Sequence, residues 1–560
     1  MDQYPTWPNL ATMMFDLAAR WPRKPLLRAY RDKAWHGTTW GEFARMAASH
    51  ARHFRRLGIV AGERVLICAE NRPDYPIAEV ALMAIGAVPV PTYTTNTIDD
   101  HAHILRDSGT RTAIVSSPAL GSRVRAAAEK SGGLDRILEM GTPEWIAMGA
   151  DTAAPGDIVA EAAAILPSAL ACLIYTSGTG GAPRGVMLPH RCILSNCQGA
   201  FELVKPLRLK DEIYLSFLPL SHAYEHTVGN FFFASLGSEI VYSRGVEHLA
   251  ADMLAIRPTL LTAVPRVLEV IKGRVLTQVA RQPAWKQRLF HWALDIGYRR
   301  QDGVALSVVE KLVDPLLDRV IRAKVRDRFG GRLVGAVSGG ARLEPDVGRF
   351  YIALGILLLQ GYGQTEAGPV IAATPVRAIK VDTVGQALKG VELRLADDGE
   401  ILVRGDLVMD GYWGRPEDTA LVLRDGWLHT GDIGTLDAAG NLRITDRKKD
   451  MIVLSGGENV SPAKIEGMLM AEPEIAQAVV AGDGRAGLTA LLVPAEGHDD
   501  VSLAMALSRA NHRLSVTERI RRHLVVEAFT VENGLLTPTQ KIRRMLVIRA
   551  NAGALAEGRG

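Results

Sequence analysis

The sequence has few cysteines and no long apolar run, and each shortage excludes a class of protein. Four cysteines in 560 residues, Cys68, Cys172, Cys192 and Cys197, form no dense framework, so we expect reduced thiols in the cytoplasm and no disulfides. The longest apolar runs, such as 352–359, are far shorter than the ~20 residues that cross a bilayer. The first twenty residues carry no recognisable export signal. Any membrane contact is therefore expected to be peripheral, on the inner membrane face.

The sequence also lacks a large excess of charge of either sign. Lys and Arg number 65 and Asp and Glu 61, a net charge of +4 with no concentrated basic tract, so no nucleic acid partner is expected. His190, Cys192 and Cys197 lie close together but lack a second ligand pair, which favours a buried helix over a zinc site. The composition, 48% hydrophobic and 22% charged, is typical of a globular protein, and the chain is too long for one ordinary domain.

Strand-like and helical patterns alternate along the first two thirds of the chain. Between residues 64 and 116, strand-like runs at 65–68, 88–93 and 112–116 are separated by an amphipathic helical pattern at 75–85 and a helical pattern at 98–107. Further strand-like runs follow at 170–175, 212–217, 239–242, 259–263, 332–337 and 356–359. This alternation predicts an α/β fold of doubly wound parallel sheets covered by helices. Ligands in such sheets bind beyond the carboxyl ends of the strands.

The pattern changes in the last third. Short alternating runs broken by glycine begin at residue 383 and predict a small antiparallel β subdomain at about 383–440. After Asp446, about a hundred residues of mixed pattern predict a separate α+β domain. We therefore expect a large N-terminal domain, 1–446, and a small mobile C-terminal domain, 447–560. A G-x-G-x-x-G match at 482–487 lies between two strand-like runs, which favours a hairpin turn over a dinucleotide site.

The most informative stretch is residues 176–185, TSGTGGAPRG, directly after the strand expected at 170–175. Its glycines allow the backbone to approach an anion closely, its three hydroxyls can donate to phosphate oxygens, and Arg184 adds a fixed positive charge. Composition alone also allows a flexible surface loop. Because a strand precedes it, the stretch favours a polyphosphate site, although it lacks the order of a Walker loop.

This stretch resembles the signature Thr-Ser-Gly-Thr-Thr-Gly-x-Pro-Lys-Gly of the superfamily of adenylate-forming enzymes, which includes acyl-CoA synthetases, luciferases and peptide-synthetase adenylation domains. Gly180 replaces the second of two adjacent threonines. Arg184 replaces the lysine, which keeps the positive charge but places it on a planar, forked guanidinium group. Further blocks that resemble this family follow in the expected order: LPLSH at 218–222, SGGA at 338–341, QGYGQTE at 360–366, TGD at 430–432 and TPTQK at 537–541. Their number and order, across about residues 170–545, make the resemblance specific.

The resemblance implies an enzyme that uses ATP, Mg²⁺ and coenzyme A. It implies that Thr176 and Glu366 hold Mg²⁺, that Asp432 accepts from the ribose hydroxyls, and that Tyr362 stacks on the adenine. Taken alone, Glu366 could cap a helix, Tyr362 could pack in a core and Asp432 could be a turn residue. The implied nucleotide site comprises Thr176, Ser177, Gly178, Thr179, Gly180, Gly181, Arg184, Gly339, Gly340, Ala341, Gln360, Gly361, Tyr362, Gly363, Thr365, Asp432, Arg447 and Lys541.

The resemblance also implies the catalytic lysine and a hinge. Lys541 would act with Glu366 and Thr176 in catalysis, whereas a lone lysine followed by two arginines would be interpreted as a solvated tail. The charged run 446–450 resembles the family hinge, with Lys449 as its pivot. The loop 455–459, with Gly456 and Gly457, resembles the segment that lines the pantetheine tunnel.

The acid substrate is indicated by residues 218–226, by the phenylalanines at 231–233 and by a long helical insertion at 267–328, which resemble long-chain fatty acyl-CoA synthetases. The resemblance places His222 and Tyr224 at the acyl and CoA site, with apolar walls. The expected reaction joins a fatty acid to CoA through an acyl-adenylate, releasing AMP and pyrophosphate. Medium-chain or aryl acids, loading of a carrier protein, and a nonenzymatic binding protein stay open as alternatives. A homodimer and peripheral membrane contact stay open as well.

Overall fold

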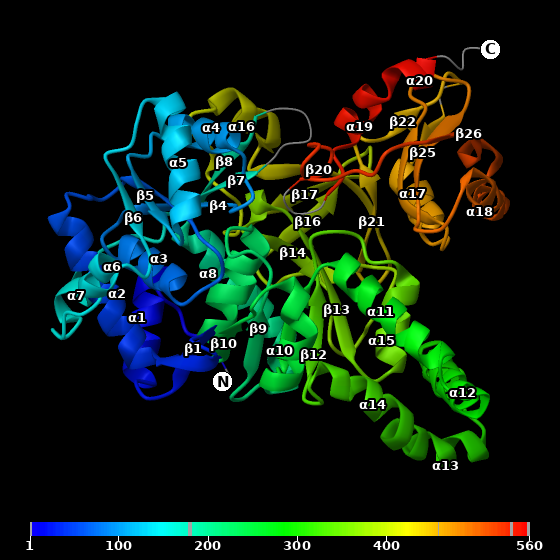
Figure 1. The fold of residues 1–560 in the computed structure, drawn as a ribbon, viewed down its shortest axis with the longest axis horizontal. Coiled ribbons are helices and arrows are strands. Elements are labelled where there is room, and N and C mark those ends of the chain that lie inside the picture. The colour runs from blue at the N-terminus through cyan, green and yellow to red at the C-terminus, as the bar shows by residue number, and fades with distance from the viewer. Residues whose placement is uncertain (1–2, 177–181, 457, 538–540, 557–560) are drawn as a thin grey trace.

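Two helix-covered sheets of mainly parallel strands form most of the molecule, and a smaller unit from the end of the chain lies against them (Figure 1). The computed structural model describes residues 3–176, 182–456, 458–537 and 541–556. The predicted fold class, α/β with a small antiparallel part and an α+β unit at the end, is confirmed. None of the helices within these ranges combines the length and the apolar character needed to cross a membrane.

The first sheet has four parallel strands in the order β4-β3-β5-β6. Its strands and connecting helices are β3 Arg64–Cys68, α3 Asp74–Ala84, β4 Val88–Thr92, α4 Ile98–Ser108, β5 Thr112–Val115, α5 Pro118–Ser131 and β6 Arg136–Glu139. The alternation predicted here is confirmed. The predicted amphipathic character of α3 is wrong, because α3 is buried along its whole length between β4 and the helices α1 Leu10–Arg20, α2 Trp40–Arg56 and α7 Gly156–Ala163.

The second sheet has nine strands in the order β15-β14-β13-β12-β11-β9-β10-β1-β2. Its central strands, from β13 to β1, run parallel, as the alternating pattern predicts. The strands are β1 Pro25–Arg31, β2 Ala34–Thr39, β9 Ile213–Ser216, β10 Glu239–Tyr242, β11 Leu260–Ala263, β12 Gly335–Ser338, β13 Leu357–Gly363, β14 Val370–Ala373 and β15 Gln386–Ala387. The carboxyl ends of β12 and β13 carry the SGGA and QGYGQTE blocks.

The strand before the glycine-rich stretch belongs to neither parallel sheet. β7 (Leu170–Thr176) pairs antiparallel with β8 (Arg184–Pro189), and β18 (Gly411–Tyr412) adds to β8. Placing this strand in the parallel rhythm was therefore wrong. In the register, Thr176 pairs with Arg184, so the ends of the glycine-rich stretch are held side by side in a hairpin.

Helix α8 (His190–Val204) follows β8 and buries His190, Cys192 and Cys197. This confirms the buried helix predicted there. Among the described residues, no cluster of three or more His, Cys, Asp or Glu side chains could hold a metal ion, and all four cysteines are free and buried.

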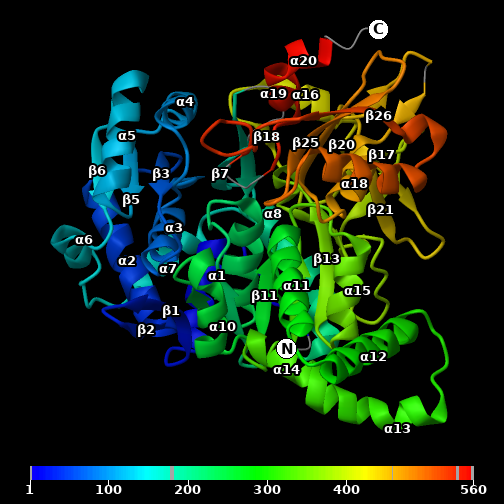
Figure 2. The ribbon, with the colours of Figure 1, turned by 45° about the vertical axis from the view of Figure 1, so that its right-hand side comes forward.

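A five-stranded antiparallel sheet forms the predicted small β region: β16 Glu392–Leu395, β17 Glu400–Arg404, β19 Leu423–Arg424, β20 Trp427–Leu436 and β21 Leu442–Arg447. The predicted helical insertion is also present, and its helices project from the side of the molecule (Figures 1 and 2). They are α11 Pro265–Ala280, α12 Ala284–Gln301, α13 Val308–Leu317 and α14 Ala323–Arg326, with the π-helix η4 Asp318–Arg322 between the last two.

Six further α- and π-helices belong to the described residues of the large part. They are α6 Pro143–Met148, the π-helix η2 Glu225–Phe232, α9 Phe233–Ser235, α10 Leu249–Ile256, α15 Pro345–Ala353 and α16 Pro416–Val422.

The unit at the carboxyl end has apolar clusters of its own, around Ile465 and Leu492 and around Val479 and Phe529. Its β24 and β25 form an antiparallel hairpin across residues 482–487, which confirms the turn predicted for the G-x-G-x-x-G match. Its elements are β22 Ile452–Val453, β23 Asn459–Val460, α17 Pro462–Met470, β24 Ile475–Ala481, β25 Leu488–Pro494, α18 Asp500–His512, β26 Ile520–Val525, α19 Arg544–Ala550 and α20 Ala552–Ala556.

Candidate active site

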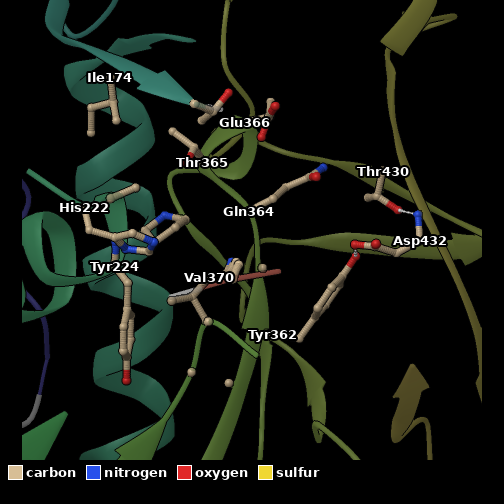
Figure 3. A pocket seen from close by; sticks show the side chains of 18 of the residues that line it. Ile174, His222, Tyr224, Tyr362, Gln364, Thr365, Glu366, Val370, Thr430 and Asp432 are labelled. Atoms are coloured by element: carbon tan, nitrogen blue, oxygen red, sulfur yellow. Dashed lines mark hydrogen bonds between the residues drawn. The ribbon is translucent and has the colours of Figure 1, made fainter. Parts of the chain in front are cut away.

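A cavity of about 1270 Å³ lies at the carboxyl ends of β12 and β13, where the nine-stranded sheet meets the five-stranded sheet and the C-terminal unit. Its lining brings together Thr176 and Arg184 from the β7–β8 hairpin, Glu366 from the turn after β13, Asp432 from β20, and Lys541. These residues come from positions up to 365 apart in the sequence. Figure 3 shows the part of the cavity between Ile174 and Asp432.

One side of the cavity carries a cluster around the Asp432 carboxylate. The Tyr362 hydroxyl donates to Oδ2 of Asp432 at 2.7 Å, as Figure 3 shows, and the Arg447 Nε lies 3.1 Å from Oδ1. The backbone N–H of Asp432 donates to the Thr430 hydroxyl at 3.1 Å. Because each carboxylate oxygen accepts more than one hydrogen bond, Asp432 is held in place and can still accept from a diol.

A second cluster links Glu366 to Arg184 through Tyr412. The Tyr412 hydroxyl donates to Oε1 of Glu366 at 2.8 Å, and the Arg184 guanidinium lies 4.2 Å from the centre of the Tyr412 ring. Tyr412 is buried, and β18 pairs it with Val186 of β8, two residues after Arg184. One aromatic side chain therefore orients both the carboxylate and the cation, through a hydrogen bond and a cation–π contact.

Glu366 and Thr176 fit the predicted Mg²⁺ site. The hydrogen bond from Tyr412 engages one Glu366 oxygen, which leaves the second for a cation. Thr176 lines the same cavity at the end of β7. One carboxylate and one hydroxyl do not form a complete cage. They match the small number of protein ligands that Mg²⁺ uses when substrate phosphates supply the rest.

Lys541 reaches the cavity from the C-terminal unit. A pair of hydrogen bonds with Thr537 holds its backbone, 2.8 Å from the Thr537 N–H to the Lys541 carbonyl and 3.0 Å from the Lys541 N–H to the Thr537 hydroxyl. The Lys541 side chain is accessible to solvent through the cavity, but the surrounding protein limits the hydration of its ammonium group. Burial, with a contribution from Arg447, lowers the pKa of Lys541 to about 8.

His222 lies at the same end of the cavity. Burial, helped by the charge of Lys541, lowers the pKa of His222 to about 3, so the ring is neutral at physiological pH. The backbone N–H of Tyr224 donates to Nδ1 of His222 at 3.2 Å. The ring proton therefore lies on Nε2, which makes His222 a neutral hydrogen-bond donor.

An apolar limb continues the cavity along one face of the sheet. Its lining includes Gly335 and Val337 of β12 and Gly339, which follows the end of that strand. On β13, Leu357 and Leu359 pair with Gly335 and Val337, and Gly361 also lines the cavity. Alternate residues of a strand share a face, and four residue steps correspond to about 13 Å. The other apolar lining residues include Ala200, Leu203, Val204, Leu207, Phe232 and Phe233. The limb is a long apolar extension of a polar chamber.

The segment predicted as a hinge passes along the cavity. The Lys448 ammonium contacts Asp398 at 2.6 Å and Glu400 at 3.0 Å, which fixes it to the five-stranded sheet. Lys449 lines the cavity, and burial lowers its pKa. The Arg447 carbonyl accepts from the backbone N–H of Asp450 at 3.0 Å, so the chain turns through Lys448 and Lys449.

Comparison with known proteins agrees with this geometry. The AMP-binding enzyme family matches residues 15–413, and the AMP-binding enzyme C-terminal domain matches residues 449–554. The chain belongs to the AMP-binding enzyme family. A solved structure shares the fold. O-succinylbenzoate coenzyme A synthetase (MenE) from Bacillus subtilis, solved in complex with ATP and magnesium ion, superposes with a TM-score of 0.72 at 20% identity, covering 95% of this chain and 98% of that one.

Two relatives in the family are similar over most of their length. The long-chain-fatty-acid CoA ligase FadD15 of Mycobacterium tuberculosis is 32% identical, covering 95% of this chain and 93% of the relative. The chloroplastic long-chain-fatty-acid acyl-carrier-protein ligase AEE15 of Arabidopsis thaliana is 28% identical, covering 87% of this chain and 78% of the relative. Both relatives act on long-chain fatty acids, but their names give different acceptors.

Most of the described candidates line the cavity. Those that do are Thr176, Arg184, His222, Tyr224, Gly339, Gly340, Gly361, Tyr362, Gly363, Thr365, Glu366, Asp432, Arg447, Lys449 and Lys541. Ala341, Gln360 and Gly456 are not among its lining residues. The Gln360 amide donates to the Val381 carbonyl at 2.7 Å, which holds it behind the sheet. Ser177, Gly178, Thr179, Gly180, Gly181 and Gly457 lie outside the described residues.

Sequence reasoning missed two residues of the site. Tyr412 has no block of its own, and its only sequence signal is the preceding glycine in Gly411-Tyr412-Trp413. Lys448 was visible in the charged run, but its partners Asp398 and Glu400 lie about fifty residues earlier. Tyr412 orients other site residues and Lys448 anchors the segment along the cavity, and both could be found only from contacts distant in sequence.

Proposed function

We propose that this chain is an ATP-dependent acid:CoA ligase that acts on long-chain fatty acids through an acyl-adenylate. The observation that carries the proposal is that one cavity joins a polar chamber, with Asp432, Glu366 and Arg184, to a long apolar limb. Lys541 lies near His222, at the junction of the chamber and the limb. A nucleotide fits the chamber and an alkyl chain fits the limb. The carboxylate of the acid then lies at the junction.

In the first step, an oxygen of the fatty acid carboxylate attacks the α-phosphorus of ATP and pyrophosphate leaves. The Lys541 ammonium stabilises the charge that develops between the carboxylate and the α-phosphate, and Arg184 holds the phosphates that leave. Asp432 accepts from the ribose hydroxyls. Mg²⁺ held by Glu366 and Thr176 would neutralise phosphate charge when bound. The neutral His222 donates from Nε2 to the acyl oxygen.

In the second step, the thiol of CoA attacks the acyl carbonyl of the adenylate and AMP leaves. The site near Lys541 must then admit a thiol. We infer that the part of the C-terminal domain that follows Lys449 rotates about this residue relative to the rest of the chain, taking Lys541 out and bringing the loop with Gly456 in. The anchoring of Lys448 to Asp398 and Glu400 supports this, because it fixes one side of the pivot.

Chain length is the first test of the substrate. Each CH₂ buried in the apolar limb should contribute about 0.8 kcal/mol, so kcat/KM is expected to climb from short to long fatty acids and to level off when the limb is full. Small aryl acids should be poor substrates. Gly335→Leu, which fills the far end of the limb, should move the optimum to shorter acids without changing KM for ATP. A preference for acetate or benzoate over dodecanoate and palmitate would contradict the long-chain assignment.

The acceptor of the acyl group distinguishes this proposal from a second candidate, an enzyme that loads an acyl carrier protein. The similarity to AEE15 is the reason to test this second candidate. Incubation with ATP, palmitate and either CoA or an acyl carrier protein distinguishes the two. Acyl-CoA formation without carrier protein supports the ligase proposed here. Acylation of the carrier alone would favour the second candidate.

Substitutions of Arg184 test the part of the proposed site that binds the phosphates of ATP. Arg184→Lys is expected to keep most activity, because a lysine keeps the charge and can still lie over the Tyr412 ring. Arg184→Ala is expected to raise KM for ATP roughly tenfold, the usual scale of one lost charged hydrogen bond. Steady-state kinetics at varied ATP measure both effects. An unaltered KM for ATP in Arg184→Ala would place this side chain outside the phosphate site.

The pH dependence tests Lys541 in the free enzyme. Because its pKa is lowered to about 8, the ammonium is present below this pH and is lost as the pH rises through it. We expect kcat/KM for adenylation, measured by acid-dependent exchange of pyrophosphate into ATP, to fall above about pH 8. Lys541→Arg, whose guanidinium stays charged, should not show this fall, whatever its residual activity. The same decline in Lys541→Arg would assign it to another group.

A further inference from the structure

The outer face of α13 is apolar although nothing in the described structure covers it. Val308 and Leu312 are each 74% exposed, Val309 is 63% exposed and Leu316 is 60% exposed. Their spacing places all four on one face of the helix, and Val320, 40% exposed, continues that face onto η4. We call these five residues the α13 face. In both overall views α13 lies at the outer edge of the molecule, at the end of the helical insertion (Figures 1 and 2).

The inner face of α13 accounts for the packing of the helix. Asp314 and Leu317 are buried there, and Leu317 joins Ala293 and Ile296 of α12 in a small apolar cluster. The Asp314 carboxylate lies 2.8 Å from the Arg322 guanidinium. The helix is therefore anchored by one face, and the exposed α13 face is not needed to hold it to the protein.

The helical insertion that carries the α13 face has more basic than acidic residues. Residues 265–328 contain 14 Lys and Arg against 7 Asp and Glu, whereas the whole chain carries a surplus of only four. The acidic residues of α13, Glu310 and Asp314, pair with arginines of the insertion. Lys311, Arg319 and Lys324 are exposed and belong to none of the ion pairs formed within the described ranges. The charges left to face solvent beside the apolar stripe are therefore cationic.

We propose that the α13 face docks the protein onto a lipid surface that carries anionic headgroups. The apolar side chains would enter the interface, while Lys311 and Arg319 bind headgroups next to them, as in helices that lie in the plane of a membrane. A second copy of the chain fits this face less well. A symmetric contact through this face would bring Lys311 and Arg319 of one copy close to the same two cations of the other, and their charges would repel. This docking surface lies outside the cavity and does not depend on the proposed function.

The test uses the full chain and vesicles. The protein is sedimented with vesicles of phosphatidylcholine alone and of equal parts phosphatidylcholine and phosphatidylglycerol. We expect binding to the mixed vesicles, weaker binding to the neutral ones, and loss of the difference at high salt. Leu312→Gln with Leu316→Gln should weaken binding roughly tenfold or more, because two anchoring side chains are lost. Lys311→Gln with Arg319→Gln should remove the preference for phosphatidylglycerol.

Helix α18 supplies a matched control. Val501 and Met505 are 69% and 61% exposed with the same four-residue spacing, so Val501→Gln with Met505→Gln should leave vesicle binding unchanged. Two results would overturn the proposal. One is the absence of binding to mixed vesicles, or binding that the change at Leu312 and Leu316 does not weaken. The other is a dimer in size-exclusion chromatography that this change dissociates while vesicles bind neither form.

Discussion

Lys541→Ala is expected to slow formation of the acyl-adenylate by ~10²-fold or more, because one well-placed charged donor stabilises the transition state by about 3 kcal/mol. Conversion of a supplied acyl-adenylate to acyl-CoA should remain largely intact, since the proposed rotation removes Lys541 from the site before that step. Acid-dependent pyrophosphate exchange measures the first step, and acyl-CoA formation from synthetic adenylate measures the second.

Lys464 gives a matched control for this result. It lies in the same C-terminal unit but pairs with Glu518 at 2.5 Å, and it is not among the residues that line the cavity. Lys464→Ala should leave both steps near the wild-type rate. An equal loss of both steps in Lys541→Ala would contradict the assignment of Lys541 to the first step alone.

Lys449→Pro is expected to slow the thioester step at least tenfold while leaving adenylation nearly unchanged. Proline fixes φ near −65°, so it restricts the backbone rotation that the second step needs. The structure holds Lys541 in the cavity, which is the arrangement that we propose for adenylation, so this step would require no rotation. Single-turnover measurements of each step separate the two effects.

Lys449→Ala is the control, because it removes the same side chain and leaves φ free. It should carry out the thioester step at close to the wild-type rate. If Lys449→Pro leaves both steps unchanged, Lys449 is not the pivot. If Lys449→Ala is as slow as Lys449→Pro, the side chain and not the backbone freedom is important.

The sequence was most informative where structure is local. The parallel strands around β3 and the ends of β12 and β13 follow from short apolar runs and from glycine-containing turns, so the location of the site could be predicted. The antiparallel partner of β7 could not, because the pairing of Thr176 with Arg184 depends on how the chain returns after the glycine-rich stretch. A strand followed by a loop looks the same in both arrangements.

Individual side chains show the same limit. Gln360 lies within a block that resembles the family, yet its amide donates a hydrogen bond to the Val381 carbonyl and the residue does not line the cavity. Tyr412 contacts Glu366 and Arg184, which lie 46 and 228 positions earlier, so no local pattern could reveal it. The burial that lowers the pKa of Lys541 arises from the packing of two units. Such properties belong to the assembled cavity.

The most direct test of the ligase assignment is a reaction with purified protein, ATP, Mg²⁺ and palmitate, with and without CoA. Without CoA, we predict exchange of labelled pyrophosphate into ATP that requires the acid. With CoA, we predict AMP and palmitoyl-CoA in equal amounts. Release of ADP and phosphate, or AMP release that does not depend on the acid, would contradict an acid:CoA ligase that works through an acyl-adenylate.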